Sequence, residues 1–139
     1  MRVLRVDHIA VAVRDLERSL GLWEVLMGTE ASPVETLPER GVRVARIAPA
    51  GGGAVELVSP LGQGSPLDGF LEKKGEGLHH ICLEVDDIEA AMAELKARGF
   101  ELLQDRPVPG AEASRIAFLH PKSSGGVLLE LRQKRAAQA

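Results

Sequence analysis

The chain has few of the residues that disulfide-rich, membrane-spanning or nucleic-acid-binding proteins need. Its single cysteine, Cys82, excludes an intramolecular disulfide and favours a reducing compartment. No apolar run reaches the roughly 20 residues of a bilayer-spanning helix, so we expect a cytoplasmic protein without a membrane partner. Aromatic residues make up only 3%, tyrosine is absent, and the formal net charge is −3. These values disfavour a base-stacking platform and a basic nucleic-acid-binding face.

What the chain does contain is an internal repeat. Residues 6–17 match residues 78–89 without a gap. The aligned pairs are His8 with His80, Ile9 with Ile81, Val13 with Val85, Asp15 with Asp87, and Glu17 with Glu89.

A second stretch of similarity adds a glutamate to each half. Residues 46–48 precede a strand with Glu56, and the same three residue types at 115–117 precede a strand with Glu130. Two halves that each supply one histidine and one glutamate can close around a single ion. Nitrogen and oxygen donors together suit cobalt, manganese, nickel or zinc better than calcium. The predicted ligands are His8, Glu56, His80 and Glu130.

Apolar spacing predicts the order β-α-β-β-β in the first half. Residues 3–13 alternate as a strand does, and Asp15 caps a helix that runs to about Met27. A weak strand near 29–34 precedes a loop over 35–41. Strands follow at 42–48 and 54–59.

The second half repeats this order after a linker with a short helix at about 67–73. The predicted elements are a strand at 79–85, a helix from Asp86 or Asp87 to Arg98, a strand or extended piece at 101–105, a loop at 107–113, and strands at 114–119 and 127–132.

Alternation within the strand at 79–85 assigns its side chains to two faces. Ile81, Leu83 and Val85 form an apolar face for the helix to cover, which leaves His80, Cys82 and Glu84 on the other face. We therefore predict an α+β fold with two paired βαβββ modules that form a curved, cup-like mixed sheet. The modules span 5–61 and 78–133, the linker spans 62–77, and the single domain spans 1–139.

The remaining titratable candidates have simpler explanations. We interpret His79 as structural, because its side chain points away from the face of His80. Cys82 has no evident base partner and is expected to be a small core residue. His120 lies in a predicted turn, where a structural role is favoured over a ligand or substrate role.

Three segments resemble the methylmalonyl-CoA epimerase family of the glyoxalase, or vicinal-oxygen-chelate, superfamily. They are residues 7–13, 79–86 and 120–131, of which the last contains the most specific stretch, His-Pro-Lys-Ser-Ser-Gly-Gly-Val-Leu-Leu-Glu. Residues 37–42 and 55–61 add to the resemblance, which extends from about residue 5 to residue 133. It implies the glyoxalase fold, a divalent metal that is typically cobalt, and interconversion of (2R)- and (2S)-methylmalonyl-CoA through a metal-stabilised enolate.

Carried over by position, the resemblance implies the same four ligands and gives Glu130 a second role as an acid/base. Some family members place a second catalytic glutamate where this sequence has Val44, and valine cannot move a proton. Glu84, Glu56, Glu39 or a metal-bound water are the candidates for that role, and none of them is strongly favoured.

Other activities of the superfamily stay open. Glyoxalase I (lactoylglutathione lyase) would use the same four ligands. A non-catalytic small-molecule-binding protein usually lacks the full ligand set, and an iron-dependent dioxygenase would typically use two histidines and one glutamate. An acyl-CoA partner would bring phosphates, and a twofold homodimer is expected because it is the commonest homo-oligomer. Candidate phosphate contacts are Arg43, Arg46, Arg115 and Lys122.

Overall fold

The structure, a computed structural model, describes residues 1–135, which fall into two compact units. The first unit comprises residues 8–79, and the second unit comprises residues 1–7 together with residues 80–135. The strands β1 (Val3–Ala12) and β5 (Gly77–Val85) each begin in one unit and end in the other. Residues 136–139, the end of the predicted domain, lie outside the described residues, and the predicted module boundaries stay a prediction.

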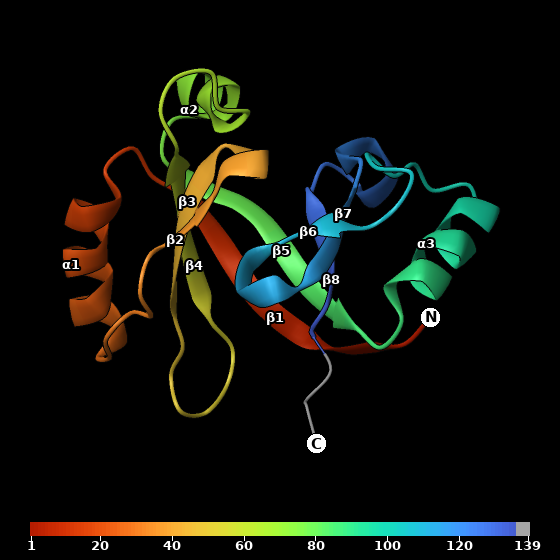
Figure 1. The fold of residues 1–139 in the computed structure, drawn as a ribbon, viewed down its shortest axis with the longest axis horizontal. Coiled ribbons are helices and arrows are strands. Elements are labelled where there is room, and N and C mark those ends of the chain that lie inside the picture. The colour runs from red at the N-terminus through yellow and green to blue at the C-terminus, as the bar shows by residue number, and fades with distance from the viewer. Residues whose placement is uncertain (136–139) are drawn as a thin grey trace. The chain divides into compact units, whose positions relative to one another are not determined.

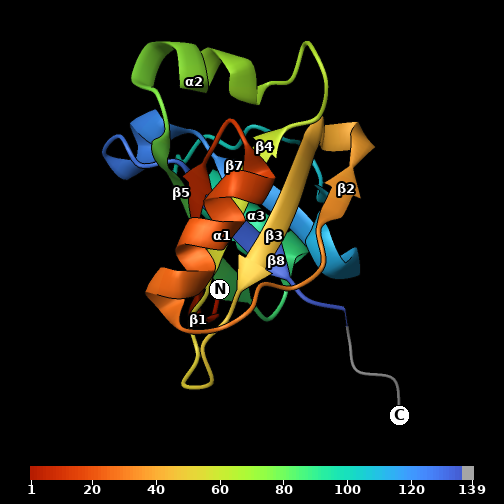
Figure 2. The ribbon, with the colours of Figure 1, turned by 90° about the vertical axis from the view of Figure 1, so that its left-hand side faces the viewer.

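The first unit is a mixed sheet with one helix against a face. Its strand order is β2 (Glu35–Leu37), β3 (Val42–Ile47), β4 (Val55–Pro60) and β1, with β1 parallel to β4 and the other pairs antiparallel. Helix α1 (Leu16–Met27) lies against this sheet (Figure 2), and α2 (Leu67–Lys74) follows β4. The core between α1 and the sheet contains Val11, Val13, Leu16, Ala45 and Leu57.

The second unit repeats this plan, as Figure 1 shows in green to blue. Its strand order is β5, β8 (Leu129–Gln133), β7 (Arg115–Leu119) and β6 (Val108–Pro109), again with one parallel pair, β5 with β8. Helix α3 (Ile88–Ala97) covers one face. The core on that face contains Val85, Ile88, Ala91, Met92, Leu95, Ala117, Leu119 and Leu131.

Both long helices begin and end as the sequence predicts. The Asp15 carboxylate accepts a hydrogen bond from the backbone N–H of Arg18, and the Asp87 carboxylate accepts one from Ala90. These caps satisfy backbone donors of the first turn that have no partner within the helix. Gly28 ends α1 with a φ of 67°, a left-handed conformation that glycine adopts without steric cost.

The predicted faces of the strands are also confirmed. Leu83 and Val85 pack with α3, whereas His80, Cys82 and Glu84 lie on the opposite face and are at least half-buried. Three short 3₁₀ segments complete the described elements: η1 (Pro38–Arg40), η2 (Ala111–Ala113) and η3 (Pro121–Ser124). Among residues 1–135, no helix has both the length and the apolar character needed to cross a membrane.

The weak strand predicted near 29–34 is wrong, and so is the loop predicted over all of 35–41. The strand is β2, at Glu35–Leu37. Ser32 approaches β3 partly through its side chain, since the Ser32 hydroxyl accepts a hydrogen bond from the Arg46 backbone N–H at 3.0 Å. Pro33 then has no N–H to donate, so regular strand pairing begins only after it.

The short strand of the second half is also displaced from its predicted place. Residues 101–105 form only an isolated bridge, between Leu102 and Leu119, and the strand β6 lies within the predicted loop 107–113. The Gln104 side-chain carbonyl accepts a hydrogen bond from the Phe118 N–H at 2.7 Å. This side-chain bond takes the place of a ladder bond, and the regular pairing is interrupted there.

The predicted match of residues 46–48 with residues 115–117 is wrong by three positions. Arg46 lies opposite Glu56 in the β3–β4 ladder, but Phe118 lies opposite Glu130 in the β7–β8 ladder. The equivalent of Arg115 is therefore Arg43. Both of these arginines form ion pairs with the helix that covers their sheet, Arg43 with Glu17 and Arg115 with Glu89.

Candidate functional site

In the first unit, the structure brings together one predicted histidine and one predicted glutamate. Glu56 of β4 lies opposite Ala10 of β1, so His8, two residues before Ala10, is on the same face as Glu56. The His8 Nε2 and Glu56 Oε1 atoms are 3.6 Å apart, and both side chains are buried.

The second unit contains the same pair in the same register. Glu130 of β8 lies opposite Cys82 of β5, and His80 is two residues before Cys82. The His80 Nε2 and Glu130 Oε1 atoms are 3.2 Å apart, and both side chains are again buried. Each βαβββ repeat thus builds one buried imidazole–carboxylate pair from two adjacent parallel strands.

The neighbours of the two pairs differ. The Arg46 guanidinium, on the strand beside Glu56, lies 3.3 Å from His8 Nδ1. At the equivalent place beside Glu130, the Phe118 ring meets the His80 ring edge-on, with centroids 5.4 Å apart. One pair therefore has a cation beside it, and the other has an apolar ring.

The donor chemistry of these pairs fits a divalent metal ion. In both pairs the imidazole Nε2 faces a carboxylate oxygen, and burial withdraws both groups from bulk water. Two imidazoles and two carboxylates provide the mixed nitrogen and oxygen donors that borderline divalent ions prefer. A single pair offers too few protein donors for a stable site of that kind.

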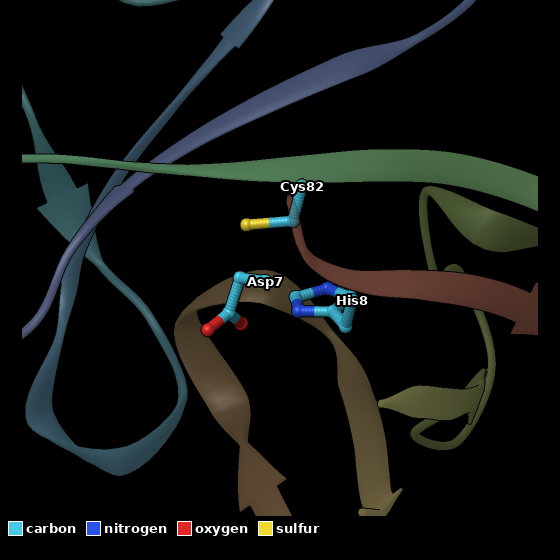
Figure 3. Close-up of side chains that lie close together, drawn as sticks. All are labelled: Asp7, His8 and Cys82. Atoms are coloured by element: carbon cyan, nitrogen blue, oxygen red, sulfur yellow. The ribbon is translucent and has the colours of Figure 1, made fainter. Parts of the chain in front are cut away.

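Cys82 and Asp7, both in the second unit, lie close together, and each has an environment that explains it without a catalytic role (Figure 3). Burial raises the pKa of the Cys82 thiol far above its usual value, and the negative charges of Glu130 and Asp7 act in the same direction. A protonated thiol is a poor nucleophile and a poor ligand. The Asp7 carboxylate forms ion pairs with Arg132 at 2.7 Å and with Lys134 at 3.2 Å.

Glu84, the weak candidate for a second acid/base, lies in a network of ion pairs. Its Oε1 atom is 2.5 Å from Arg5 Nη1 and 3.2 Å from Lys134 Nζ, and the residue is buried. These contacts favour a structural role for Glu84.

The other two histidines have structural contacts. The His79 ring packs edge-on against Phe70 with centroids 4.8 Å apart. His120 precedes η3, where its Nδ1 atom accepts a hydrogen bond from the Lys122 backbone N–H at 3.1 Å. These positions agree with the structural interpretation of His79 and with the favoured structural interpretation of His120.

Three of the four basic residues considered as phosphate contacts form ion pairs within their own unit. Arg43 pairs with Glu17, Arg115 with Glu89, and Lys122 with Glu101.

Arg46 differs from these three because it lies beside a predicted metal ligand. Sequence reasoning missed this contact, since the repeat was aligned with Arg46 in the place of Arg115. The glutamates give the correct signal: counted from Glu56 and Glu130, the equivalent of Arg46 is Phe118.

Comparison with known proteins agrees with this geometry. A model of the Glyoxalase/Bleomycin resistance protein/Dioxygenase superfamily matches residues 7–118. The mitochondrial methylmalonyl-CoA epimerase of Mus musculus is 45% identical over 130 residues, which cover 93% of this chain and 72% of that protein.

A bacterial relative and a solved structure extend the match to almost full length on both sides. The ethylmalonyl-CoA/methylmalonyl-CoA epimerase of Cereibacter sphaeroides is 43% identical over 131 residues, covering 93% of this chain and 97% of that protein. A structure of methylmalonyl-CoA epimerase in complex with methylmalonyl-CoA and NH4+ is similar with a TM-score of 0.90, 36% identity and 99% coverage of both chains. The chain therefore belongs to the Glyoxalase/Bleomycin resistance protein/Dioxygenase superfamily and, within it, to the methylmalonyl-CoA epimerase family.

Proposed function

We propose that this chain interconverts (2R)- and (2S)-methylmalonyl-CoA and that its two imidazole–carboxylate pairs together hold one divalent metal ion. The observation that carries the proposal is the repetition of a buried pair in one register, His8 with Glu56 and His80 with Glu130. Family membership and the substrate after which several relatives are named support the choice of reaction.

The reaction requires removal of the proton on the carbon between the two carbonyl groups of the substrate. A bound divalent ion would supply Lewis acidity, which stabilises negative charge on the carbonyl oxygens. We assign Glu130 as one acid/base. Its cross-strand neighbour on β7 is the apolar Phe118, in contrast to Arg46 opposite Glu56. Proton transfer by a positioned carboxylate contributes about 10²–10⁴-fold to a rate.

Glu56 is better suited to ligation than to proton transfer. Arg46 lies opposite Glu56 in the β3–β4 ladder and its guanidinium contacts His8, so a cation is already present beside this pair. Glu84 remains a candidate for the second acid/base, although its ion pairs with Arg5 and Lys134 count against it.

The proposal is tested by isotope exchange. The metal-loaded protein is incubated with (2R)-methylmalonyl-CoA in deuterated water, and mass spectrometry together with chiral analysis follows deuterium at the α-carbon and formation of the (2S) epimer. We expect both products. Full metal occupancy without exchange or epimerisation would contradict the proposal and favour glyoxalase I or a non-catalytic binding protein.

Three further properties are proposed with their measurements. We expect cobalt to give the highest activity when the metal-free protein is loaded in turn with cobalt, manganese, nickel and zinc. We expect sedimentation analysis to give the mass of a homodimer, the commonest form of homo-oligomer. We expect cell fractionation to place the protein in the cytoplasm.

A further inference from the structure

Inversion at a carbon atom requires one group that takes a proton from one side and another that gives a proton to the other side. Glu130 supplies one of these groups in the proposed function, on which this inference rests. A second carboxylate on the face of the proposed ligands His8 and Glu56 would supply the other group.

The strand register places Glu35 on that face. Glu35 of β2 lies directly opposite Val44 of β3, and Val44 lies directly opposite Val58 of β4. Val58 is two residues after Glu56 and therefore shares its face. Because directly paired residues share a face of the sheet, Glu35, Val44 and Glu56 all lie on the same side.

Glu35 is also the carboxylate that remains after the ligands are assigned. In the strand residues 8–12, 35–37, 42–47 and 55–60, the acidic residues are Glu35 and Glu56. Glu39 belongs to η1, outside the paired strands, and is exposed.

The Glu35 side chain can extend over the face of the sheet that carries His8 and Glu56. Its cross-strand neighbour Val44 is buried, and Leu37, on the same face of β2, is buried too, whereas Glu35 itself is half-buried. Side chains of directly paired residues have Cβ atoms about 4.5–5.5 Å apart. A glutamate side chain is long enough to extend over a valine at that separation, toward the strand that carries Glu56.

We propose that Glu35 is the second acid/base of the epimerisation. In one direction, Glu130 takes the α-proton, the C–H electron pair forms the substrate enolate, and protonated Glu35 delivers its proton to the opposite side. Glu35 is then ionised and Glu130 protonated, and proton exchange with water restores the starting state. In the reverse direction the two glutamates exchange roles.

The variant Glu35→Gln separates proton exchange from inversion. We expect its epimerisation rate to fall by about 100-fold or more, the size of a lost general acid/base contribution. The epimer whose α-proton faces Glu130 should still exchange that proton for deuterium at a rate near that of the wild type, while the other epimer should not. Metal content, measured by mass spectrometry of the protein, should be unchanged.

Matched variants complete the test. Glu30→Gln, an exposed glutamate just before β2, should keep full activity. Moving the carboxylate one strand across, in Glu35→Gln with Val44→Glu, should restore part of the inversion.

Epimerisation by Glu35→Gln within threefold of the wild-type rate would overturn the proposal, as would loss of its metal. Exchange without inversion in Glu84→Gln instead of Glu35→Gln would also overturn it. Inactivity of the wild type toward both epimers would contradict the proposed function itself.

Discussion

The two imidazole–carboxylate pairs consist of the same residue types, but their neighbours on the same face of the sheet differ. His8 with Glu56 and His80 with Glu130 come from equivalent strand positions. Their neighbours at three further equivalent positions are Arg46 and Phe118, Ala10 and Cys82, and Val58 and Arg132. The proposed ligand positions carry the same residue types in both units, whereas these flanking positions differ between the two units.

These differences give each unit a separate electrostatic character. The first unit has a positive charge next to its histidine, Arg46 at 3.3 Å from His8. The second unit has an apolar ring next to its histidine, and its buried charge lies further along, in the ion pair of Arg132 with Asp7. We infer that the first unit is better suited than the second to hold an anionic substrate group.

The largest expected effect is a loss of stability when the buried ion pair of the second unit is broken. Asp7→Asn leaves the Arg132 guanidinium buried with a weaker partner, although Glu112 still accepts a hydrogen bond from Arg132. Breaking a buried pair on one side costs about 3–5 kcal/mol in the free energy of unfolding. Urea denaturation measures this loss, and hydrogen exchange should locate it in residues 1–7 and 80–135.

The matched control removes both charges and makes the second unit resemble the first. Asp7→Leu with Arg132→Val, which introduces the residue type of Val58, should be less destabilising than Asp7→Asn alone, because no buried charge is left without its partner. A double variant less stable than the single one would show that the pair stabilises the fold through more than charge compensation.

Replacing Arg46, the neighbour of His8, should have a smaller effect, on kcat/KM. Two neutral imidazoles, two carboxylates and a divalent ion have no net charge, so Arg46 gives the site an excess positive charge. Arg46→Phe, which introduces the residue type of Phe118, should lower kcat/KM by about 10–100-fold, mainly through KM. This corresponds to the roughly 1.5–3 kcal/mol of a hydrogen bond to a charged group.

The metal content of Arg46→Phe distinguishes a contact with the substrate from a role in positioning His8. An unchanged metal content supports a direct role for Arg46 toward an anionic substrate group. Loss of the metal would contradict that role, because it would mean that Arg46 holds His8 in place. Phe118→Leu is the control in the other unit, and it should change KM less because it keeps an apolar side chain beside His80.

The sequence predicted those parts of the structure that follow from the alternation of apolar residues and from helix capping. Alternation assigned His80, Cys82 and Glu84 to one face, and aspartate caps located both long helices. The short strands β2 and β6 were misplaced because they have three and two residues, too few for a period to be recognised. Their positions depend on long-range contacts, such as that of Ser32 with Arg46, that no local pattern contains.

The site itself was predicted only as a set of ligands. The repeat identified the histidines and glutamates, because identical residues recur at matched places. It could not identify Arg46 or Glu35, whose equivalents in the other half are different residues or lie in displaced strands. The strand register was needed to place Arg46 beside His8 and Glu35 opposite Val44.

Metal stoichiometry is the most direct test of the claim that the two pairs share one ion. Wild-type protein, His8→Ala and His80→Ala are loaded with cobalt, separated from free metal by gel filtration and analysed by elemental mass spectrometry. We expect one ion per wild-type chain and loss of most of the metal during gel filtration of either variant, since only three of the four ligands remain. Two ions per chain, or one ion retained by either variant, would contradict a shared site.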